Sequence, residues 1–141
     1  MSYDLEVAMI REARSLGMLT CPYVFDRQTA RAMARAGADV LVAHVGLTTK
    51  GSIGAETALT LDEAAGRVQE MHDAAREVRD DVIVLCHGGP IAEPADAERV
   101  LQRTQGIAGF FGASSIERLA VEPAIEEQAR RFRSIRMPKR G

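Results

Sequence analysis

Apolar residues recur every three or four positions in three stretches of the chain, and this spacing predicts amphipathic helices. The first stretch covers residues 5–16 and is followed by Gly17, which suits a helix C-terminus. The second covers residues 26–37, and it begins with an aspartate whose carboxylate can accept hydrogen bonds from a first helical turn. The third, residues 60–78, opens on Thr60-Leu-Asp-Glu63, which has the spacing of a capping box.

Helix signals of the same kind continue toward the C-terminus. Pro94 is suited to the first position of a helix and precedes the apolar residues of a fourth stretch. A one-turn helix is predicted from Ile116, and a last helix is predicted over residues 123–135. Residues 136–141 are expected to form a frayed tail.

Four short apolar runs separate these helices and predict strands. The runs cover residues 18–24, 39–44, 81–86 and 106–111. The runs 39–44 and 81–86 are rich in β-branched residues and show no polar alternation, which is typical of parallel strands covered on both faces.

Strands that alternate with helices predict parallel pairing through right-handed crossovers, and therefore the α/β class. The 141 residues favour one domain, residues 1–141, that contains four strand-helix units. Because a closed (β/α)₈ barrel needs roughly 200 residues or more, the chain forms either a small open sheet or about half of a barrel.

The charge, the apolar runs and the cysteine spacing of the sequence disfavour several classes of function. The chain has 18 Lys plus Arg and 20 Asp plus Glu, a formal net charge of -2, which disfavours binding to nucleic acid or to an anionic membrane surface. The sequence contains neither a secretory signal nor an apolar run long enough to span a membrane, so we expect a cytoplasmic protein. Its two cysteines, Cys21 and Cys86, lack the spacing of a zinc site and are expected to be reduced thiols.

Ligands of parallel α/β proteins bind at the carboxyl ends of the strands, and two histidines stand at such ends. His44 ends the run 39–44, and His87 follows the run 81–86. Each imidazole could act as a general base, donate to a developing oxyanion or ligate a metal, or could equally be a structural, hydrogen-bonded residue. Cys86 is expected in the core and Cys21 is expected to be a small buried residue, although it could face the site.

Two small-residue turns follow neighbouring strands and could hold a phosphate through backbone amides. The alternative is that the glycines supply turn conformations and the serine caps a helix. The candidate phosphate-binding residues are Gly88, Gly89, Gly112, Ala113, Ser114 and Ser115.

A long Gly-, Thr- and Ser-rich segment, residues 46–57, lies between the second strand and the third helix, and long loops of this kind are often binding loops. Lys50 could contact a phosphate, and Glu56 could serve as an acid, a base or a metal ligand. A flexible, solvated loop is the alternative. The basic residues near the C-terminus are expected to form a solvated helix face.

Six collinear motifs resemble the phosphoenolpyruvate hydrolase-like TIM-barrel family, which is also described as a predicted signal-transduction barrel similar to indole-glycerol-phosphate synthase. The motifs are Tyr3-Asp-Leu-Glu-Val-Ala-Met-Ile10, Thr20-Cys-Pro-Tyr-Val-Phe25, Ala43-His-Val-Gly-Leu-Thr-Thr49, Gly51-Ser-Ile-Gly-Ala55, Leu85-Cys-His-Gly-Gly-Pro-Ile91 and Gly109-Phe-Phe-Gly-Ala-Ser-Ser115. Together they cover nearly the whole chain.

The resemblance implies about half of a TIM barrel, because the chain is similar only to the C-terminal half of longer family members. It is then a truncated domain, or a half-barrel that associates with a second copy or with another half. The family name implies hydrolysis of a phosphoenol or phosphonate three-carbon acid, with His44 and His87 as motif positions. Mg²⁺ enters by analogy only, and its carboxylate ligands would have to come from outside this chain. A non-catalytic regulatory barrel that binds a ligand or a protein is the alternative, since related domains occur in plant virus-resistance proteins.

Overall fold

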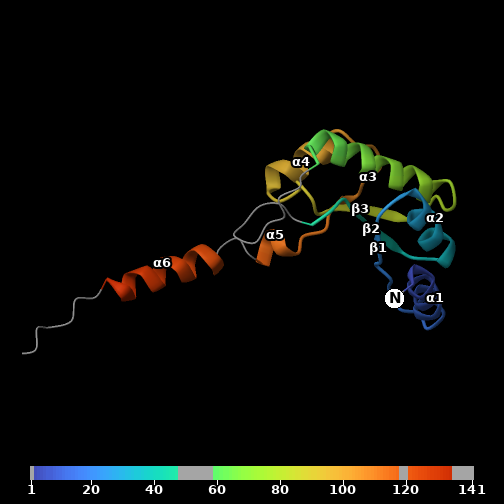
Figure 1. The fold of residues 1–141 in the computed structure, drawn as a ribbon. Coiled ribbons are helices and arrows are strands. Elements are labelled where there is room, and N and C mark those ends of the chain that lie inside the picture. Colours follow the sequence, from blue (N-terminus) through green and yellow to red (C-terminus); the bar gives the residue numbers. More distant parts are fainter. Residues whose placement is uncertain (1, 48–58, 118–120, 135–141) are drawn as a thin grey trace, which may run out of the picture.

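A computed structural model describes residues 2–47, 59–117 and 121–134 as an α/β fold (Figure 1). Four parallel strands form one sheet in the order β1-β2-β3-β4, consistent with a partial (β/α) barrel. The elements in chain order are α1 (Tyr3–Ser15), β1 (Tyr23–Val24), α2 (Arg27–Ala36), β2 (Val40–His44), α3 (Leu61–Arg76), β3 (Ile83–His87), α4 (Pro94–Gln102), β4 (Gly109–Phe110), α5 (Ser114–Glu117) and α6 (Val121–Arg133).

The predicted helices are present, and their ends follow the local signals in the sequence. Asp26 caps α2 by accepting a hydrogen bond from the Thr29 N–H, and Gly37 ends α2 in the left-handed region at φ 90°. Thr60 and Glu63 form the predicted capping box of α3. The one-turn helix begins two residues earlier than predicted, at Ser114.

The two outer strands are shorter than the sequence predicts. The predicted run 18–24 contributes only Tyr23 and Val24 as strand, and the run 106–111 contributes only Gly109 and Phe110. β1 and β4 lie at the two edges of the sheet, and each pairs with one strand only within it. Fewer of their residues therefore have the hydrogen bonds that define a strand. The chain before β1 is nevertheless tied to β2, because the Thr20 and Pro22 carbonyls accept hydrogen bonds from the β2 amides, both at 3.0 Å.

One face of the sheet packs against the helices. Leu41 and Ala43 of β2 and Val84 and Cys86 of β3 join residues of α2, α3 and α4 in the buried core, and Figure 1 shows α3 and α4 along this side of the sheet. Their neighbours in sequence point to the opposite face. There, the expectation of strands covered on both faces holds for Val42, which is 1% exposed, and fails for Ile83, which is 47% exposed.

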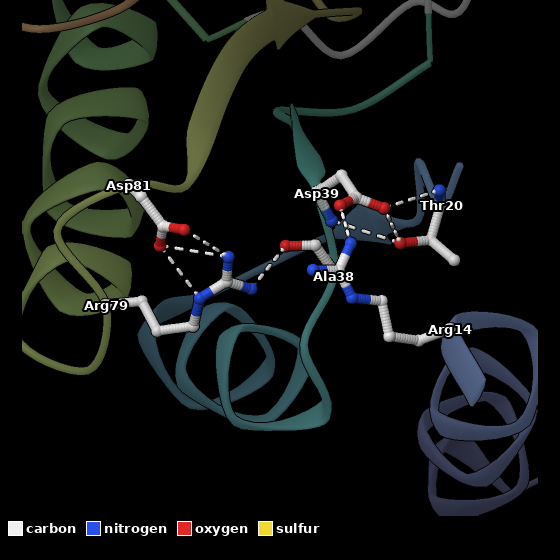
Figure 2. Close-up of polar contacts among 6 residues, drawn as sticks. All are labelled: Arg14, Thr20, Ala38, Asp39, Arg79 and Asp81. Atoms are coloured by element: carbon white, nitrogen blue, oxygen red, sulfur yellow. Dashed lines mark hydrogen bonds and ion pairs between the residues drawn. The ribbon is translucent and has the colours of Figure 1, made fainter. Parts of the chain in front are cut away.

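The amino end of the sheet is held by a saturated polar network around Asp39, just before β2 (Figure 2). The Asp39 carboxylate accepts hydrogen bonds from the Thr20 N–H at 2.9 Å and hydroxyl at 2.8 Å, and it also contacts the Arg14 guanidinium. The Thr20 hydroxyl in turn accepts from the Asp39 N–H at 3.0 Å. These hydrogen bonds from Thr20, together with Arg14, hold the pKa of the Asp39 carboxyl below its usual value.

A second clamp at the same end joins the segment before β3 to the segment before β2 (Figure 2). The Arg79 guanidinium donates to both carboxylate oxygens of Asp81, each at 2.9 Å, and to the Ala38 carbonyl at 2.9 Å. Arg79 thereby fixes the spacing of two adjacent strands at their start. In the described ranges, no helix combines the length and the hydropathy required to cross a lipid bilayer.

Candidate functional site

The carboxyl ends of β1, β2 and β3 bring three rings together. His44 and His87 are register partners, and their ring centroids lie 5.1 Å apart at an interplanar angle of 67°. The Tyr23 ring stacks on His87 at 5.2 Å and 29°, and meets His44 edge-on, also at 5.2 Å. Because parallel register places these side chains on the same face, the two histidines predicted as site residues do meet.

Two phenylalanines complete this group, which we call the ring cluster: Tyr23, Phe25, His44, His87 and Phe111. The Phe25 ring lies 5.5 Å from the His44 ring, and the Phe111 ring lies 5.7 Å from the His87 ring. The cluster therefore draws residues from every strand of the sheet or from the position directly after it, and it surrounds both imidazoles with apolar ring surface.

Tyr3 of α1 supports the ring cluster from behind. Its hydroxyl donates a hydrogen bond to the Tyr23 carbonyl at 3.0 Å, and its ring meets Phe25 edge-on at 6.2 Å. Burial raises the pKa of Tyr3 to about 12, so this hydroxyl remains a donor at any physiological pH.

The hydrogen bond of His44 fixes its tautomer. The Gly46 N–H donates to Nδ1 of His44 at 3.1 Å. A ring nitrogen that accepts a hydrogen bond carries no proton, so the neutral imidazole holds its proton on Nε2. Burial, and next the neighbouring His87, lower the pKa of His44 below its ordinary value and favour this neutral form.

His87 has the opposite arrangement. Its Nδ1 lies 2.7 Å from the Phe111 carbonyl oxygen, and since a carbonyl can only accept, Nδ1 must donate. In a neutral ring, Nε2 is then an unprotonated acceptor. The side chain is buried, at 8% exposure, and contacts both the Tyr23 and the Phe111 rings, which also contact each other at 6.1 Å.

The pair therefore offers a matched donor and acceptor. Within the part of the chain that the structure describes, neither Nε2 atom has a hydrogen-bond partner. His44 presents an N–H and His87 presents a lone pair, on rings 5.1 Å apart. Such a pair can polarise one atom of a small molecule while it removes a proton from another.

The predicted glycine turn after β3 is built for close backbone approach. Gly88 has φ +79°, and a Cβ added to it would lie 2.3 Å from the Gly46 carbonyl oxygen. Gly89 has φ +58°, and its N–H donates to that same oxygen at 2.7 Å. The Gly89 amide is thus engaged within the protein, and the two glycines join the end of β3 to the segment after β2.

The predicted turn after β4 leads into α5. A Cβ on Gly112 would meet the end of the Ile116 side chain at 2.4 Å, and the Ala113 carbonyl accepts from the Ile116 N–H at 2.9 Å. Ser114 begins α5, and the buried Ser115 Oγ atom has no hydrogen-bond partner among the described residues. The turn therefore lies beside the ring cluster, since Phe111 immediately precedes it.

The remaining candidates are Lys50, Glu56 and the two cysteines. Lys50 and Glu56 lie outside the described residues. Cys86 is buried as predicted, whereas the prediction of a buried Cys21 is wrong, because Cys21 is exposed in an apolar groove beside α1. His72 is a packing residue on α3 that hydrogen-bonds Asp73 at 2.9 Å, far along the chain from the strand ends.

No group of three or more His, Cys, Asp or Glu side chains within residues 2–47, 59–117 and 121–134 lies close enough to hold a metal ion. The ring cluster supplies two imidazoles and no carboxylate. The described residues therefore do not fit the carboxylate-held Mg²⁺ that the resemblance suggested, and no step is assigned to a metal here.

Sequence reasoning missed the two phenylalanines of the ring cluster. Strand ends identify His44, His87 and Tyr23 as candidates, but not Phe25 and Phe111. The usable signal was alternation, because Tyr23 and Phe25 are two residues apart and must share a face with whatever β2 places opposite them.

Comparison with known proteins identifies the family. The family described as phosphoenolpyruvate hydrolase-like matches residues 1–135. This chain belongs to the phosphoenolpyruvate hydrolase-like family. The match includes every described element, so the ring cluster lies within the region that defines membership.

Three relatives of this family member show what it is similar to. The tomato (Solanum lycopersicum) proteins "ToMV susceptible protein tm-1(GCR26)" and "ToMV resistance protein Tm-1(GCR237)" are each 55% identical over 97% of this chain and 18% of their own length. The "Putative transcriptional regulatory protein y4pA" of Sinorhizobium fredii is 28% identical over 96% of this chain and 22% of its own length. The chain thus spans about a fifth of the length of these relatives.

Proposed function

We propose that the chain carries the catalytic edge of a phosphoenolpyruvate hydrolase-like enzyme that acts on a small phosphorylated or phosphonate carboxylate. The observation behind this proposal is the His44–His87 pair, with one ring nitrogen that can donate and one that can accept. Among the described residues neither of these nitrogens has a partner, so both are available to a bound ligand.

The proposed hydrolysis divides between the two rings. His87 Nε2 takes a proton from water as the water oxygen forms a bond to phosphorus, and the bond between phosphorus and the enol oxygen breaks. The electron pair of that bond stays on the enol oxygen, where the His44 Nε2–H donates a hydrogen bond. For a phosphonate the carbon–phosphorus bond breaks instead, and the electron pair delocalises to the carbonyl oxygen.

The phosphate group would lie toward the turn at Gly112, Ala113, Ser114 and Ser115, with Gly88 and Lys50 as further candidates. Gly89 would contribute to the shape of its turn, since its N–H donates to the Gly46 carbonyl. The unpartnered Ser115 hydroxyl oxygen supports this placement. Glu56 remains a proposed acid or base. Calorimetry with phosphoenolpyruvate tests the turn: Gly112→Leu should weaken binding, and equal affinity would remove the turn from the site.

Release of inorganic phosphate from phosphoenolpyruvate and from phosphonopyruvate tests the enzyme itself. His87→Ala should abolish turnover while circular dichroism shows an intact fold, and His72→Gln, on the far helix, should retain the rate. Turnover that persists in His87→Ala would exclude His87 as the base.

A second candidate is a non-catalytic regulatory barrel, which the names of the relatives favour, since two are resistance or susceptibility proteins and one is a putative transcriptional regulator. In that case the ring cluster would bind a small molecule or a protein partner without turnover. Binding of phosphoenolpyruvate by calorimetry, with no phosphate released, would distinguish this function.

We also propose that the exposed face of the sheet is covered by a second copy or by another half-barrel in a cytoplasmic assembly, with no role for nucleic acid or membrane. The support is apolar exposure on this face: Tyr23 is 39% exposed and Ile83 is 47% exposed. Size-exclusion chromatography with light scattering tests this, and a stable monomer over a wide concentration range would contradict it.

A further inference from the structure

We propose that the His44–His87 pair has an activity of its own, keto–enol proton exchange at the carbon next to the carbonyl of a small 2-oxo acid. This exchange needs no phosphate group and no phosphoryl transfer to water. It rests on the proposed function only for the choice of 2-oxo acid, because hydrolysis of a phosphoenol acid releases one.

The first step of the argument is the fixed asymmetry of the two rings. His44 cannot act as a base through Nδ1, which accepts from the Gly46 N–H at 3.1 Å, and its Nε2 carries the proton. His87 cannot act as an acceptor through Nδ1, which donates to the Phe111 carbonyl at 2.7 Å. Backbone groups hold both assignments, so the roles do not interchange without breaking a hydrogen bond.

The second step is the chemistry that such a pair fits. His87 Nε2 accepts the proton as the carbon–hydrogen bond beside the carbonyl breaks. The electron pair of that bond forms the carbon–carbon double bond, and the carbonyl π electrons move to oxygen. That oxygen receives a hydrogen bond from His44 Nε2–H. The proton on His87 Nε2 exchanges with solvent, and the reverse step delivers a solvent-derived proton or deuteron to carbon.

The third step is the environment. Tyr23, Phe25 and Phe111 contact the imidazoles, and burial, followed by the neighbouring His87, favours the neutral form of His44. His44 is half-buried and His87 is 8% exposed, and a hydrogen bond to a developing enolate is stronger there than in bulk water because the local dielectric constant is lower. Tyr23 acts as a positioning residue, since its ring stacks on His87 at 5.2 Å.

The experiment uses the full chain with pyruvate in D₂O, in a buffer without imidazole. Proton NMR follows loss of the methyl signal as deuterium replaces hydrogen at C3. We expect exchange well above that of buffer alone and of heat-unfolded protein. His72→Gln is the matched control, because it changes a histidine outside the ring cluster.

Two glutamine variants then separate the roles. The amide nitrogen of Gln reaches about as far from the backbone as imidazole Nε2 and can donate, but it cannot act as a base at neutral pH. His44→Gln should therefore retain exchange within about tenfold, whereas His87→Gln should lose about 100-fold or more. His87→Asn is a control for folding, because its side-chain amide can still donate to the Phe111 carbonyl. This variant should be as inactive as His87→Gln.

The outcomes distinguish the two proposals. Exchange that requires His87, with no release of phosphate from phosphoenolpyruvate, supports this inference and overturns the proposed hydrolysis. Phosphate release without exchange overturns this inference alone. Exchange equal to that of buffer in the folded protein, or retained in His87→Gln and lost in His44→Gln, also overturns it.

Discussion

The two ends of the sheet use different kinds of side chain. At the amino end, Asp39 and Arg79 are saturated by Thr20, Arg14, Asp81 and backbone groups. At the carboxyl end, among the described residues, two imidazoles each use one ring nitrogen for the fold and leave the other unpaired. Saturated contacts stabilise the sheet, whereas unpaired donors and acceptors are available to a ligand, as the usual division of labour in (β/α) folds requires.

The largest effect on stability should come from a substitution at Gly88, in the turn that joins the end of β3 to the segment after β2. In Gly88→Ala the new Cβ would lie 2.3 Å from the Gly46 carbonyl oxygen at a φ of +79°, so we expect a loss of about 3 kcal/mol or more in the free energy of unfolding. Urea denaturation measures it. Gly66→Ala is the matched control, because its Cβ would meet no atom within 4 Å and should stabilise α3 by about 0.5–1 kcal/mol. Equal stability of the two variants would refute the strained turn.

The next effect concerns the amino end. Thr20 is 3% exposed, and Thr20→Val removes a hydroxyl that both donates to and accepts from Asp39. We expect a loss of about 1–3 kcal/mol in the free energy of unfolding, because the Asp39 N–H is left unpaired. Thr20→Ser, which keeps the hydroxyl, should recover most of it. Exchange or hydrolysis per folded molecule should be unchanged, and a loss of activity would show that the two ends are coupled.

A smaller difference in stability is expected between variants of two ion pairs, Arg79–Asp81 and Arg131–Glu127. Arg79 donates to Asp81 and to the Ala38 carbonyl, whereas the Arg131 side chain, among the described residues, pairs with Glu127, one turn away on α6. Arg79→Met should destabilise by about 1 kcal/mol and Arg131→Met by no more than about 0.5 kcal/mol. Thermal unfolding compares them, and an equal change would argue against a clamp between strands at Arg79.

The smallest effect is a pH dependence that belongs to His44. The folded pKa of His44 lies below its ordinary value of 6.5, so the unfolded chain binds the proton first as pH falls. Stability should therefore decline as pH falls below about 6.5 and stop declining below the folded pKa. The Asp39 carboxyl, whose pKa is also lowered, contributes only at more acidic pH. His44→Asn should flatten the profile between pH 5 and 7, and an unchanged slope would assign it to another group.

The sequence predicted the helices better than the strands, because the signals of a helix end are local. The Asp26 cap, the left-handed Gly37 and the Thr60–Glu63 box each involve residues within a few positions of one another. The lengths of β1 and β4 depend instead on a neighbouring strand, which no local pattern encodes.

The candidate site was predictable in the same uneven way. His44 and His87 followed from strand ends alone, but the aromatic residues around them required the register, which pairs Tyr23 with Val42 and His44 with His87. The ring tautomers could not be predicted, since they depend on the Gly46 amide and on the Phe111 carbonyl, 24 positions from His87.

The two cysteines differ in exposure, so their rates of alkylation report on opening of the fold. Cys21 is exposed, whereas Cys86 of β3 is fully buried, and burial raises the pKa of its thiol to about 11. An alkylating reagent should modify Cys21 first and Cys86 only when the helices that cover it move away from the sheet. The rate of the second alkylation therefore measures how often the core next to β3, the strand that carries His87, opens to solvent.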